Sequence, residues 1–518
     1  MAASDYSFRP FLDALGDDWY ADDPVLQAIL EHHGLTTAAG RAKVERYGKY
    51  AASAAASGTN ATDRPGELPY LTPFDDHGEP HPMGIHIPQA TRRNLAAALR
   101  AGVATEPDLL VRYAMAYLHM QGGEGGVICS LACTDGFVLA ADDLDCTPES
   151  DAAAAHIRTQ APGGPVHAAQ FVTEVQGGSD AATNTVRAVP QDDGSWLLSG
   201  KKWFCSNAWA QYWAVTARPE GAPEGPRGVA LFMVPREVDG KPNGFRFDRL
   251  KDKLGTRSLP TAEMTLSGAR AWPMGDLQSG LSNMVRIVLT TSRFWNALWG
   301  AAALRACTRI ARAYAEFRVA FGRPIAEFPL VAHTLDTLDR DHREHTAAVF
   351  AVLAAWRAAE TEGAPREAQI RARILVMLAK TCGTRRATEE AHSAIMVLGG
   401  NGIEERFSAL PRLLRDAVIM ETWEGPHGLL LTRSLMDLKR YGAASDPEGF
   451  TRLLLGGDDP AAASLGTHLG EILADGDPRS AMLAFRDWAG ELYDAVGRVA
   501  WRAVKVGRTP SGPGTLHA

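Results

Sequence analysis

Apolar residues along the first 160 positions recur mostly at helical spacing. The runs Leu95–Leu99 and Leu109–Met120 place apolar side chains on one helical face, which predicts helices. Glycines within residues 122–126 interrupt this spacing, and an apolar run from Val127 to Cys133 follows them. Because Ala, Gly and Pro dominate Thr159–Pro165, we expect a loop that closes this part of the chain.

The spacing changes between about residues 166 and 275, where strand patterns predominate. Thr185–Val189 alternates between apolar and polar positions, and Gln191–Gly194 has the composition of a turn. Tyr212–Thr216 and Gly228–Val234 are further predicted strands. A β segment therefore interrupts a chain that is otherwise helical.

Long helical patterns return after about residue 277. Ser292–Phe317, Leu330–Trp356 and Ala368–Val397 are each long enough to cross a bundle of four or more helices. A weaker stretch follows Tyr441, and Met482–Val506 predicts one more helix before a tail rich in Pro and Gly.

These changes of pattern divide the chain into four predicted parts. A helical N-terminal domain comprises residues 1–165, and a middle β domain comprises residues 166–276. A helical bundle comprises residues 277–440, and a helical extension comprises residues 441–518. A chain of 518 residues is expected to form several domains, because a single hydrophobic core does not grow to that size.

Charge and cysteine content exclude several functional classes. The formal net charge of −8 gives no general attraction to nucleic acid or to an anionic membrane. Cys129 and Cys133 have no second pair at metal-ligand spacing, so we expect no metal and read the six cysteines as reduced thiols. No uninterrupted apolar stretch of about 18 residues and no apolar signal core in Met1–Pro10 are evident. We therefore expect a cytoplasmic protein with no membrane partner.

Six short strings follow one another along the chain, and the first of them, a glycine-rich turn, can approach a planar or anionic ligand closely. Glycine-rich turns let backbone N–H groups approach such a ligand closely, although each string taken alone is an ordinary turn or helix end. The strings are Phe171–Asp180, Gly200–Asn207, Leu250–Ser258, Phe317–Arg323, Leu398–Gly402 and Trp423–Gly425.

This ordered set, spread from about residue 110 to 437, resembles the acyl-CoA dehydrogenase family and most closely its AidB-like branch. The resemblance implies an α+β, mostly α fold: an N-terminal helical domain, a middle antiparallel β-barrel domain, and a C-terminal four-helix bundle with a helical extension. It also implies an FAD cofactor at the junction of these domains. A homodimer or homotetramer is implied as well, because the flavin site of the family is shared between subunits.

The resemblance assigns several residues to the cofactor. Thr173 and Ser206 match positions whose hydroxyl or backbone touches the isoalloxazine ring, and Phe204 matches the aromatic residue beside it. Ser179 matches a position near the bound acyl chain or pantetheine. Turn caps and a core phenylalanine are the alternative interpretation of these four residues.

Further cofactor contacts are implied by two strings in the bundle. Arg318 and Phe321 match the string that reaches FAD across the dimer interface, and a guanidinium suits pyrophosphate because it bonds two oxygens at once. The turn with Gly399, Gly400 and Gly402 would let the backbone approach the ADP portion of FAD. A pair of glycines that only ends a helix is the alternative.

Glu424 matches the catalytic base of the family. A buried carboxylate would remove the α-proton of an acyl thioester while hydride passes from the β-carbon to flavin N5, and desolvation makes such a carboxylate a better base. Arg293 matches an arginine near the substrate cleft, with a surface ion pair as the alternative. A solvated or salt-bridged side chain is the ordinary role of a lone glutamate.

Some residues depart from the family pattern. Pro426 and His427 follow Gly425 where the family usually has Thr or Ser and a polar residue that help to hold FAD phosphate, and proline also removes an N–H donor. Met396 and Pro329 replace glutamines found in many members. FAD binding is therefore expected to be weakened or rearranged, and the substrate need not be a simple fatty acyl-CoA.

These features leave three functional hypotheses. The first is α,β-dehydrogenation of an acyl thioester, carried by CoA or by a carrier protein, with electron-transfer flavoprotein or dioxygen as the electron acceptor. The second is a flavin oxidase or monooxygenase acting on a specialised metabolite, which would not need Glu424. The third is a DNA-associated flavoprotein.

The extension argues against DNA as a partner. Residues 441–518 contain ten Asp and Glu against seven Lys and Arg, a net charge of −3, whereas a nucleic-acid footprint is clustered and basic. Arg498, Arg502 and Lys505 do recur at helical spacing, which leaves one small basic patch, although a solvated helix face is the better interpretation.

Overall fold

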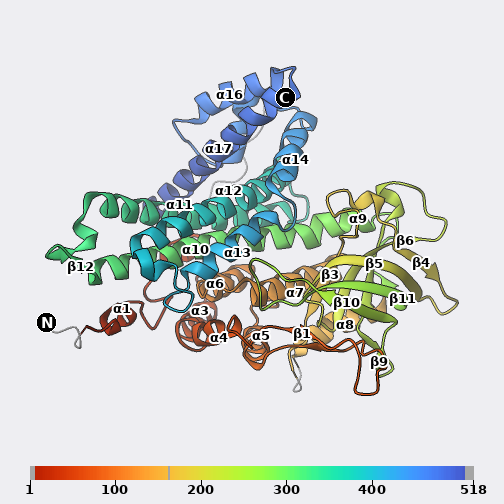
Figure 1. Ribbon diagram of the computed structural model, residues 1–518. Helices are drawn as coiled ribbons and strands as arrows, with labels where there is room; N and C mark the ends of the chain where they lie inside the picture. The colour runs from red at the N-terminus through yellow and green to blue at the C-terminus, as the bar shows by residue number, and fades with distance from the viewer. Residues whose placement is uncertain (1–5, 161–163, 508–518) are drawn as a thin grey trace. The chain divides into compact units, whose positions relative to one another are not determined.

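The computed structural model describes residues 6–160 and 164–507 (Figure 1). Residues 161–163 of the predicted Thr159–Pro165 loop, and the Pro/Gly-rich tail from residue 508, lie outside the described residues. The chain divides into two compact units. Unit 1 comprises Met1–Ala56, Asp108–Gly123 and Arg293–Ala518, and unit 2 comprises Ser57–Pro107 and Glu124–Ser292.

Unit 1 is built almost entirely of helices. Its elements are α1 (Arg9–Asp13), α2 (Pro24–His32), α3 (Ala38–Tyr50), α6 (Leu109–Met120), α10 (Thr290–Phe317), α11 (Pro329–Ala359), α12 (Arg366–Leu398), α13 (Leu410–Thr422), α14 (His427–Arg440), α15 (Pro447–Leu455), α16 (Ala462–Ala474), α17 (Pro478–Val506) and the hairpin of β12 (Val319–Ala320) and β13 (Arg323–Pro324). The predicted helices Ser292–Phe317, Leu330–Trp356, Ala368–Val397 and Met482–Val506 correspond to α10, α11, α12 and α17.

The C-terminal helices of unit 1 pack on its long helices. Helix α17 contacts α11, α12, α14 and α16, and Figure 1 shows α14, α16 and α17 grouped beside α11 and α12. Trp488 is fully buried and donates from Nε1 to the carbonyl of Leu465 at 2.9 Å, which ties α17 to α16. The predicted extension is therefore part of the hydrophobic core of unit 1.

Unit 2 combines a β-sheet with several helices. Its elements are α4 (Ala56–Thr62), β1 (Tyr70–Leu71), β2 (Ile85–His86), α5 (Gln89–Ala101), α7 (Gly125–Asp143), α8 (Pro148–Thr159), β3 (Ala168–Phe171), β4 (Arg187–Pro190), β5 (Trp196–Ser206), β6 (Tyr212–Pro219), β7 (Ala230–Pro235), β8 (Glu237–Val238), β9 (Lys241–Pro242), β10 (Phe245–Leu250), β11 (Thr261–Pro273) and α9 (Gly280–Asn283).

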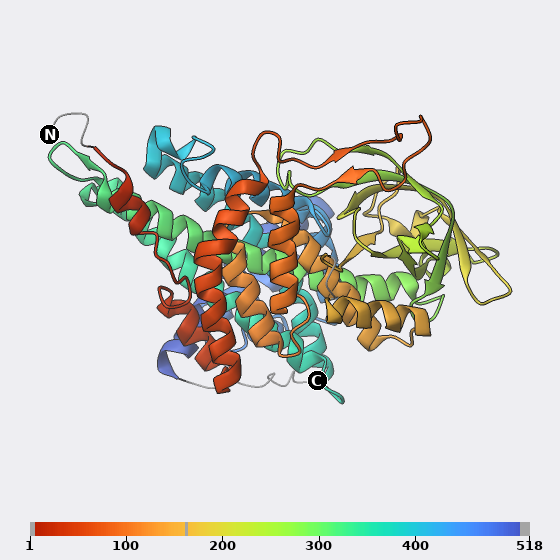
Figure 2. The ribbon, with the colours of Figure 1, turned by 90° about the horizontal axis from the view of Figure 1, so that it is seen from below.

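The main sheet of unit 2 closes on itself. Its strands follow the order β10-β11-β5-β4-β6-β3, and β7 pairs with both β11 and β6. The pairings β11–β5–β4–β6–β7 therefore return to β11 and form a barrel, and Figure 2 shows these strands, in yellow and green, curving around a common interior. Most pairs are antiparallel, as predicted, but β3 and β4 run parallel to β6.

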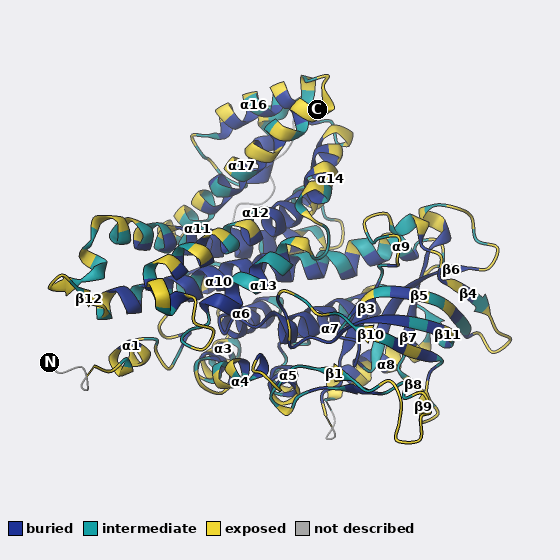
Figure 3. Cartoon of the chain, in the orientation of Figure 1, coloured by how far each residue is buried: buried dark blue, intermediate teal, exposed yellow. Residues whose placement is uncertain are grey.

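Helix α7 is the buried helix of unit 2, and it contains the predicted apolar run Val127–Cys133. It begins where the carboxylate of Glu124 accepts hydrogen bonds from the N–H groups of Gly126 and Val127, both at 2.7 Å. Figure 3 shows it dark blue along most of its length. Among the described residues α7 alone is long and apolar enough by composition to cross a membrane, but the helix is mostly buried, and a buried core helix passes the same test.

The predicted architecture is confirmed at the level of the fold: a mostly helical chain with a middle β-barrel and a C-terminal helical domain. The three boundaries between the four predicted domains stay a prediction. The two compact units group the residues differently, because the helices before residue 165 are divided between both units.

Candidate active site

The residues singled out in the sequence fall into both compact units, and each group is described within its own unit. Unit 2 contains Thr173, Ser179, Phe204 and Ser206. Unit 1 contains Arg293, Arg318, Phe321, Gly399, Gly400, Gly402 and Glu424.

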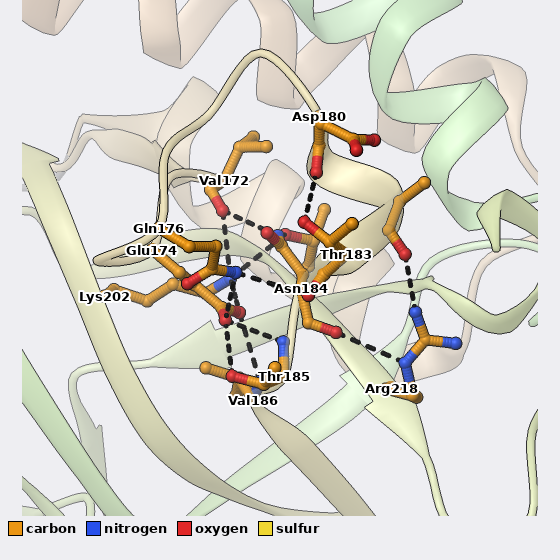
Figure 4. Close-up of polar contacts among 12 residues, drawn as sticks. Val172, Glu174, Gln176, Asp180, Thr183, Asn184, Thr185, Val186, Lys202 and Arg218 are labelled. Atoms are coloured by element: carbon orange, nitrogen blue, oxygen red, sulfur yellow. Dashed lines mark hydrogen bonds and ion pairs between the residues drawn. The ribbon is translucent and has the colours of Figure 1, made fainter. Parts of the chain in front are cut away.

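The glycine-rich turn after β3 is organised around the buried carboxylate of Glu174 (Figure 4). This carboxylate accepts hydrogen bonds from the backbone N–H of Thr185 at 2.6 Å, its hydroxyl at 2.9 Å, and the backbone N–H of Val186 at 3.1 Å. Glu174 is 1% exposed, so these bonds replace the water that the carboxylate loses on folding. The turn is thereby anchored to the residues that lead into β4.

Lys202 completes this arrangement as a buried ion pair. Its ammonium lies 3.0 Å from Glu174 Oε1 and also donates to the Val172 carbonyl and the Thr216 hydroxyl, both at 3.1 Å. Burial acts to raise the pKa of Glu174, but Lys202 and the backbone N–H donors outweigh it and hold that pKa below its ordinary value. Sequence reasoning missed this pair, since nothing in the sequence distinguishes Lys202 from its exposed neighbour Lys201.

Glu174→Gln is expected to lower the free energy of unfolding by about 3 kcal/mol, because it leaves the Lys202 ammonium buried without its counter-charge. Lys201→Met is the matched control, since Lys201 is half exposed and pairs with Asp248 at 3.2 Å. The Lys201→Met substitution should change the free energy of unfolding by less than about 1 kcal/mol. Urea unfolding of both variants measures the difference, and equal losses would show that the buried pair has no special role.

Thr173, Phe204 and Ser206 are brought together in unit 2. The N–H of Trp203 donates to the Thr173 carbonyl at 2.9 Å, which joins the glycine-rich turn to β5. Phe204 and Ser206 are two residues apart on this strand and so share one face, while Cys205 between them is fully buried on the other. The Ser206 hydroxyl lies 3.2 Å from that of Thr261, and Phe204 is 50% exposed. Ser179 lies further along the turn and is exposed.

These residues fit a planar flavin. An aromatic ring and a hydroxyl lie on one face of β5, and the Lys251 ammonium, which pairs with Glu263 at 2.7 Å, lies 4.3 Å from the Phe204 ring centroid. A β-carbon added at Gly178 would collide with the Thr173 hydroxyl, so glycine keeps that hydroxyl in place.

The glycine turn that follows α12 in unit 1 is accessible. Gly399 has a φ of +58°, which disfavours other residues, and a β-carbon at Gly402 would collide with the Ile395 carbonyl. A β-carbon at Gly400 would meet no atom within 4 Å, so this backbone is open to a ligand. Asn401 donates to the Tyr314 hydroxyl at 2.9 Å and fixes the turn against α10.

Arg318 and Phe321 lie at the hairpin of β12 and β13. Phe321 is 97% exposed and has a φ of +52°, and Figure 3 shows this end of unit 1 in yellow. The Arg318 guanidinium is also exposed and donates to the Tyr6 hydroxyl at 3.1 Å. The hairpin thus presents an aromatic ring and a cation that are available to another molecule.

Glu424 lies in the short turn between α13 and α14. Its backbone adopts a φ of +56°, which is uncommon outside glycine. Arg293 donates from Nε to the Glu424 carbonyl at 3.0 Å, so this predicted substrate-binding residue contacts the backbone of the predicted base. Burial lowers the pKa of Arg293 although the Glu424 carboxylate opposes that shift. The predicted pair of Glu424 and Arg293 is therefore brought together within unit 1.

The side chain of His427 faces the carboxylate of Glu421 at the end of α13. Its Nε2 lies 3.6 Å from a carboxylate oxygen of Glu421. Burial, with Lys380 and Arg385 nearby, lowers the pKa of His427 to about 4, so the imidazole is neutral at neutral pH. A neutral imidazole cannot supply a positive charge for a flavin phosphate. Pro426 precedes α14 and provides no side-chain cap.

Cysteines and metal-binding residues add nothing to this site. Cys129 Sγ and Cys133 Sγ lie 3.9 Å apart within α7, and all six cysteines are free thiols. Within residues 6–160 and 164–507, no group of three His, Cys, Asp or Glu side chains is placed to hold a metal ion.

Comparison with known proteins identifies two family domains. The family model for the acyl-CoA dehydrogenase middle domain matches residues 169–269, and the model for the acyl-CoA dehydrogenase C-terminal domain matches residues 278–437. Together the two matches cover about half of the chain. They include all of the residues that the sequence analysis assigned to a site.

Two known relatives share this region. The Escherichia coli protein AidB is 34% identical over 277 residues, which are 53% of this chain and 49% of AidB. The Caenorhabditis elegans acyl-CoA dehydrogenase family member 11 is 33% identical over 318 residues, which are 59% of this chain and 51% of the relative. The chain thus spans about half the length of these relatives.

Solved structures match over almost the whole chain. The apo form of a protein named Bd2924 superposes with a TM-score of 0.85 and 27% identity, covering 94% of this chain and 97% of that one. Caenorhabditis elegans ACDH-11 in complex with C11-CoA gives a TM-score of 0.80 and 25% identity, covering 94% and 87%. The similarity therefore includes the parts of the chain outside the two matched family domains.

Proposed function

We propose that this chain, which belongs to the acyl-CoA dehydrogenase family, introduces an α,β double bond into an acyl thioester with Glu424 as the base. Enzymes of this family are FAD-dependent oxidoreductases that act on CH–CH groups. The observation that carries the proposal is the turn of Glu424, whose unusual backbone conformation is held by the partly buried Arg293. A carboxylate that only formed a surface ion pair would not need such a turn.

The residues of the chain account for the proton half of the reaction. The thioester carbonyl acidifies the neighbouring α C–H, and Glu424 takes that proton on its carboxylate. FAD, when bound, accepts the hydride that leaves the β-carbon. Arg293 holds the Glu424 carbonyl, which fixes the direction in which the side chain leaves the backbone. In unit 2, Thr173, Phe204 and Ser206 provide the hydroxyls and the ring that would orient the flavin.

An acyl-CoA of about the length found in the ACDH-11 complex is the first substrate to test. Incubation of the FAD-loaded protein with acyl-CoAs from short to long chains and an artificial electron acceptor should produce the α,β-unsaturated thioester, two mass units lighter. Mass spectrometry of the thioesters measures this product. The same acyl groups are also tested on a carrier protein. If only these thioesters are converted, α,β-dehydrogenation is supported and CoA is not the carrier. If no thioester of either kind is converted, the proposal is wrong.

Retention of Glu424 favours proton abstraction over the flavin oxidase or monooxygenase alternative, because oxygen transfer from a flavin does not need this carboxylate. The DNA-associated alternative gains little from the extension, since Arg502, one of its three aligned cations, is bonded to Asp459.

Electron-transfer flavoprotein or dioxygen as the acceptor, and a cytoplasmic location, stay proposals. Reoxidation of the reduced enzyme by dioxygen alone within seconds would identify an oxidase.

A homo-oligomer is also proposed, supported by the bare Phe321 ring at the tip of its hairpin. Such a ring is readily covered by a second copy of the chain that shares its flavin site. Sedimentation equilibrium at micromolar concentration should give the mass of two or four chains, and the mass of a single chain would contradict the proposal.

A further inference from the structure

We infer that Lys380 is a positioning residue for Glu424: its ammonium clamps both ends of the turn that presents this carboxylate and places a positive charge beside it. The inference rests on the proposed function, since it assigns Lys380 a role through the proposed base. Nothing in the sequence pointed to Lys380, which is one of several cations along α12.

The contacts of Lys380 are specific to the turn. Lys380 is fully buried on α12, and its Nζ donates to the Glu421 carbonyl at 2.7 Å and to the Gly425 carbonyl at 2.8 Å. Glu421 belongs to the last turn of α13, where carbonyls lack partners within the helix and the helix dipole favours a cation. One ammonium thus joins the end of α13 to the residue directly after Glu424.

The conformation of the turn requires such a clamp. A non-glycine residue with a φ of +56° is strained, and it persists only where the surroundings enforce it. Arg293 holds the Glu424 carbonyl at 3.0 Å, and Lys380 holds the carbonyls of Glu421 and Gly425. Two cations, one from α10 and one from α12, therefore fix three carbonyls of this five-residue segment.

The charges around Lys380 make it more than a structural lysine. The carboxylates of Glu424 and Glu421 raise the pKa of Lys380, whereas the guanidinium of Arg293 on α10 lowers it. On α14, the pKa of His427 is lowered by burial and by the charges of Lys380 and Arg385, both on α12, so its imidazole is neutral. Burial dominates and lowers the pKa of Lys380 to about 7. The charge beside Glu424 therefore changes at the pH at which enzymes work.

Removing this charge should alter how Glu424 titrates. A cation near a carboxylate favours its ionised form, so without the cation the carboxylate stays protonated to higher pH. In flavin-loaded protein, Lys380→Met is expected to slow flavin reduction by an acyl-CoA at least tenfold. It should also move the acid limb of the pH profile upward by about half a pH unit or more. Lys380→Gln, which is neutral but still donates a hydrogen bond, should shift the limb in the same direction and serves if Lys380→Met does not fold.

Arg371→Met is the matched control. Arg371 is another cation of α12, and its guanidinium lies against Gly456, away from the turn of Glu424. Burial lowers its pKa to about 10, so its loss also removes a buried charge from this helix. The control should leave the acid limb in place and the reduction rate within about threefold of wild type.

Hydrogen exchange of the turn provides a readout that does not depend on turnover. The backbone amides of residues 421–425 and of His427 should exchange at least tenfold faster in Lys380→Met and at the wild-type rate in Arg371→Met. If wild type is reduced but Lys380→Met keeps its acid limb and its rate, the inference is wrong. If no thioester reduces wild type, the proposed function fails, and hydrogen exchange decides about the clamp: faster exchange supports it and unchanged exchange overturns it.

Discussion

Replacing Glu424 by glutamine should leave FAD bound but slow its reduction by acyl-CoA by about a thousandfold or more, because the general base is lost while the shape of the side chain stays. Arg293 and Lys380 bond backbone carbonyls of this turn, so the substitution does not remove their partners. The flavin spectrum and the melting temperature should therefore stay close to wild type. Stopped-flow absorbance under anaerobic conditions measures the reduction rate.

Glu421→Gln is the matched control for this variant. Glu421 lies on the same turn, but its side chain contacts the Thr388 hydroxyl and faces His427 and Arg385. Its loss should change the reduction rate by less than about tenfold. A Glu424→Gln protein that is reduced at the wild-type rate would remove Glu424 from the chemistry, and equal losses in both variants would indicate a general effect on the turn.

Acidification from pH 7 to pH 4.5 should destabilise unit 1 by several kcal/mol, because it contains buried neutral histidines. His119, His342 and His345 are each at most 5% exposed, and burial lowers the pKa of each to about 4. Their imidazoles bind protons in the unfolded chain below about pH 6.5 but stay neutral in the folded chain until about pH 4. Their contribution is present above pH 6.5 and is lost as the pH falls from 6.5 to 4. Each histidine contributes about 3 kcal/mol over that range.

His342→Gln tests one of these contributions. His342 Nε2 lies 3.1 Å from the Tyr117 hydroxyl, and an amide can keep a hydrogen bond there without titrating. Urea unfolding between pH 4.5 and 7 should show a weaker pH dependence for this variant, by up to one proton. His333→Gln is the control on the same helix, because His333 is exposed. An unchanged slope in His342→Gln would show that this histidine does not contribute to acid unfolding.

Periodicity predicted the elements of this fold well, because it reports which face of a segment is buried. Leu109–Met120 is helix α6 to the residue, and Asp108 caps it by accepting from the N–H groups of Leu110 and Val111. The run Val127–Cys133, however, covers only part of the N-terminal half of the longer helix α7. The four glycines before this run concealed its start, where the Glu124 carboxylate satisfies two N–H groups that glycine alone would leave to water.

Only part of the candidate site could be predicted from the sequence. The short strings predict residues that contact a ligand, and the structure places Thr173, Phe204 and Ser206 together and Arg293 beside Glu424. The two buried lysines that bond a carboxylate or backbone carbonyls near these residues were missed, since the sequence does not distinguish a buried lysine from a solvated one. Lys202 and Lys380 are fully buried, and only tertiary packing determines that.

Anaerobic titration of the FAD-loaded protein with acyl-CoAs, followed by visible absorbance, tests the central proposal most directly. We expect at least one thioester to bleach the flavin absorbance near 450 nm in proportion to the amount added, with Glu424→Gln unresponsive to the same thioester. Flavin that is bound normally but is reduced by no acyl thioester, on CoA or on a carrier protein, would contradict α,β-dehydrogenation and leave the family fold with another chemistry.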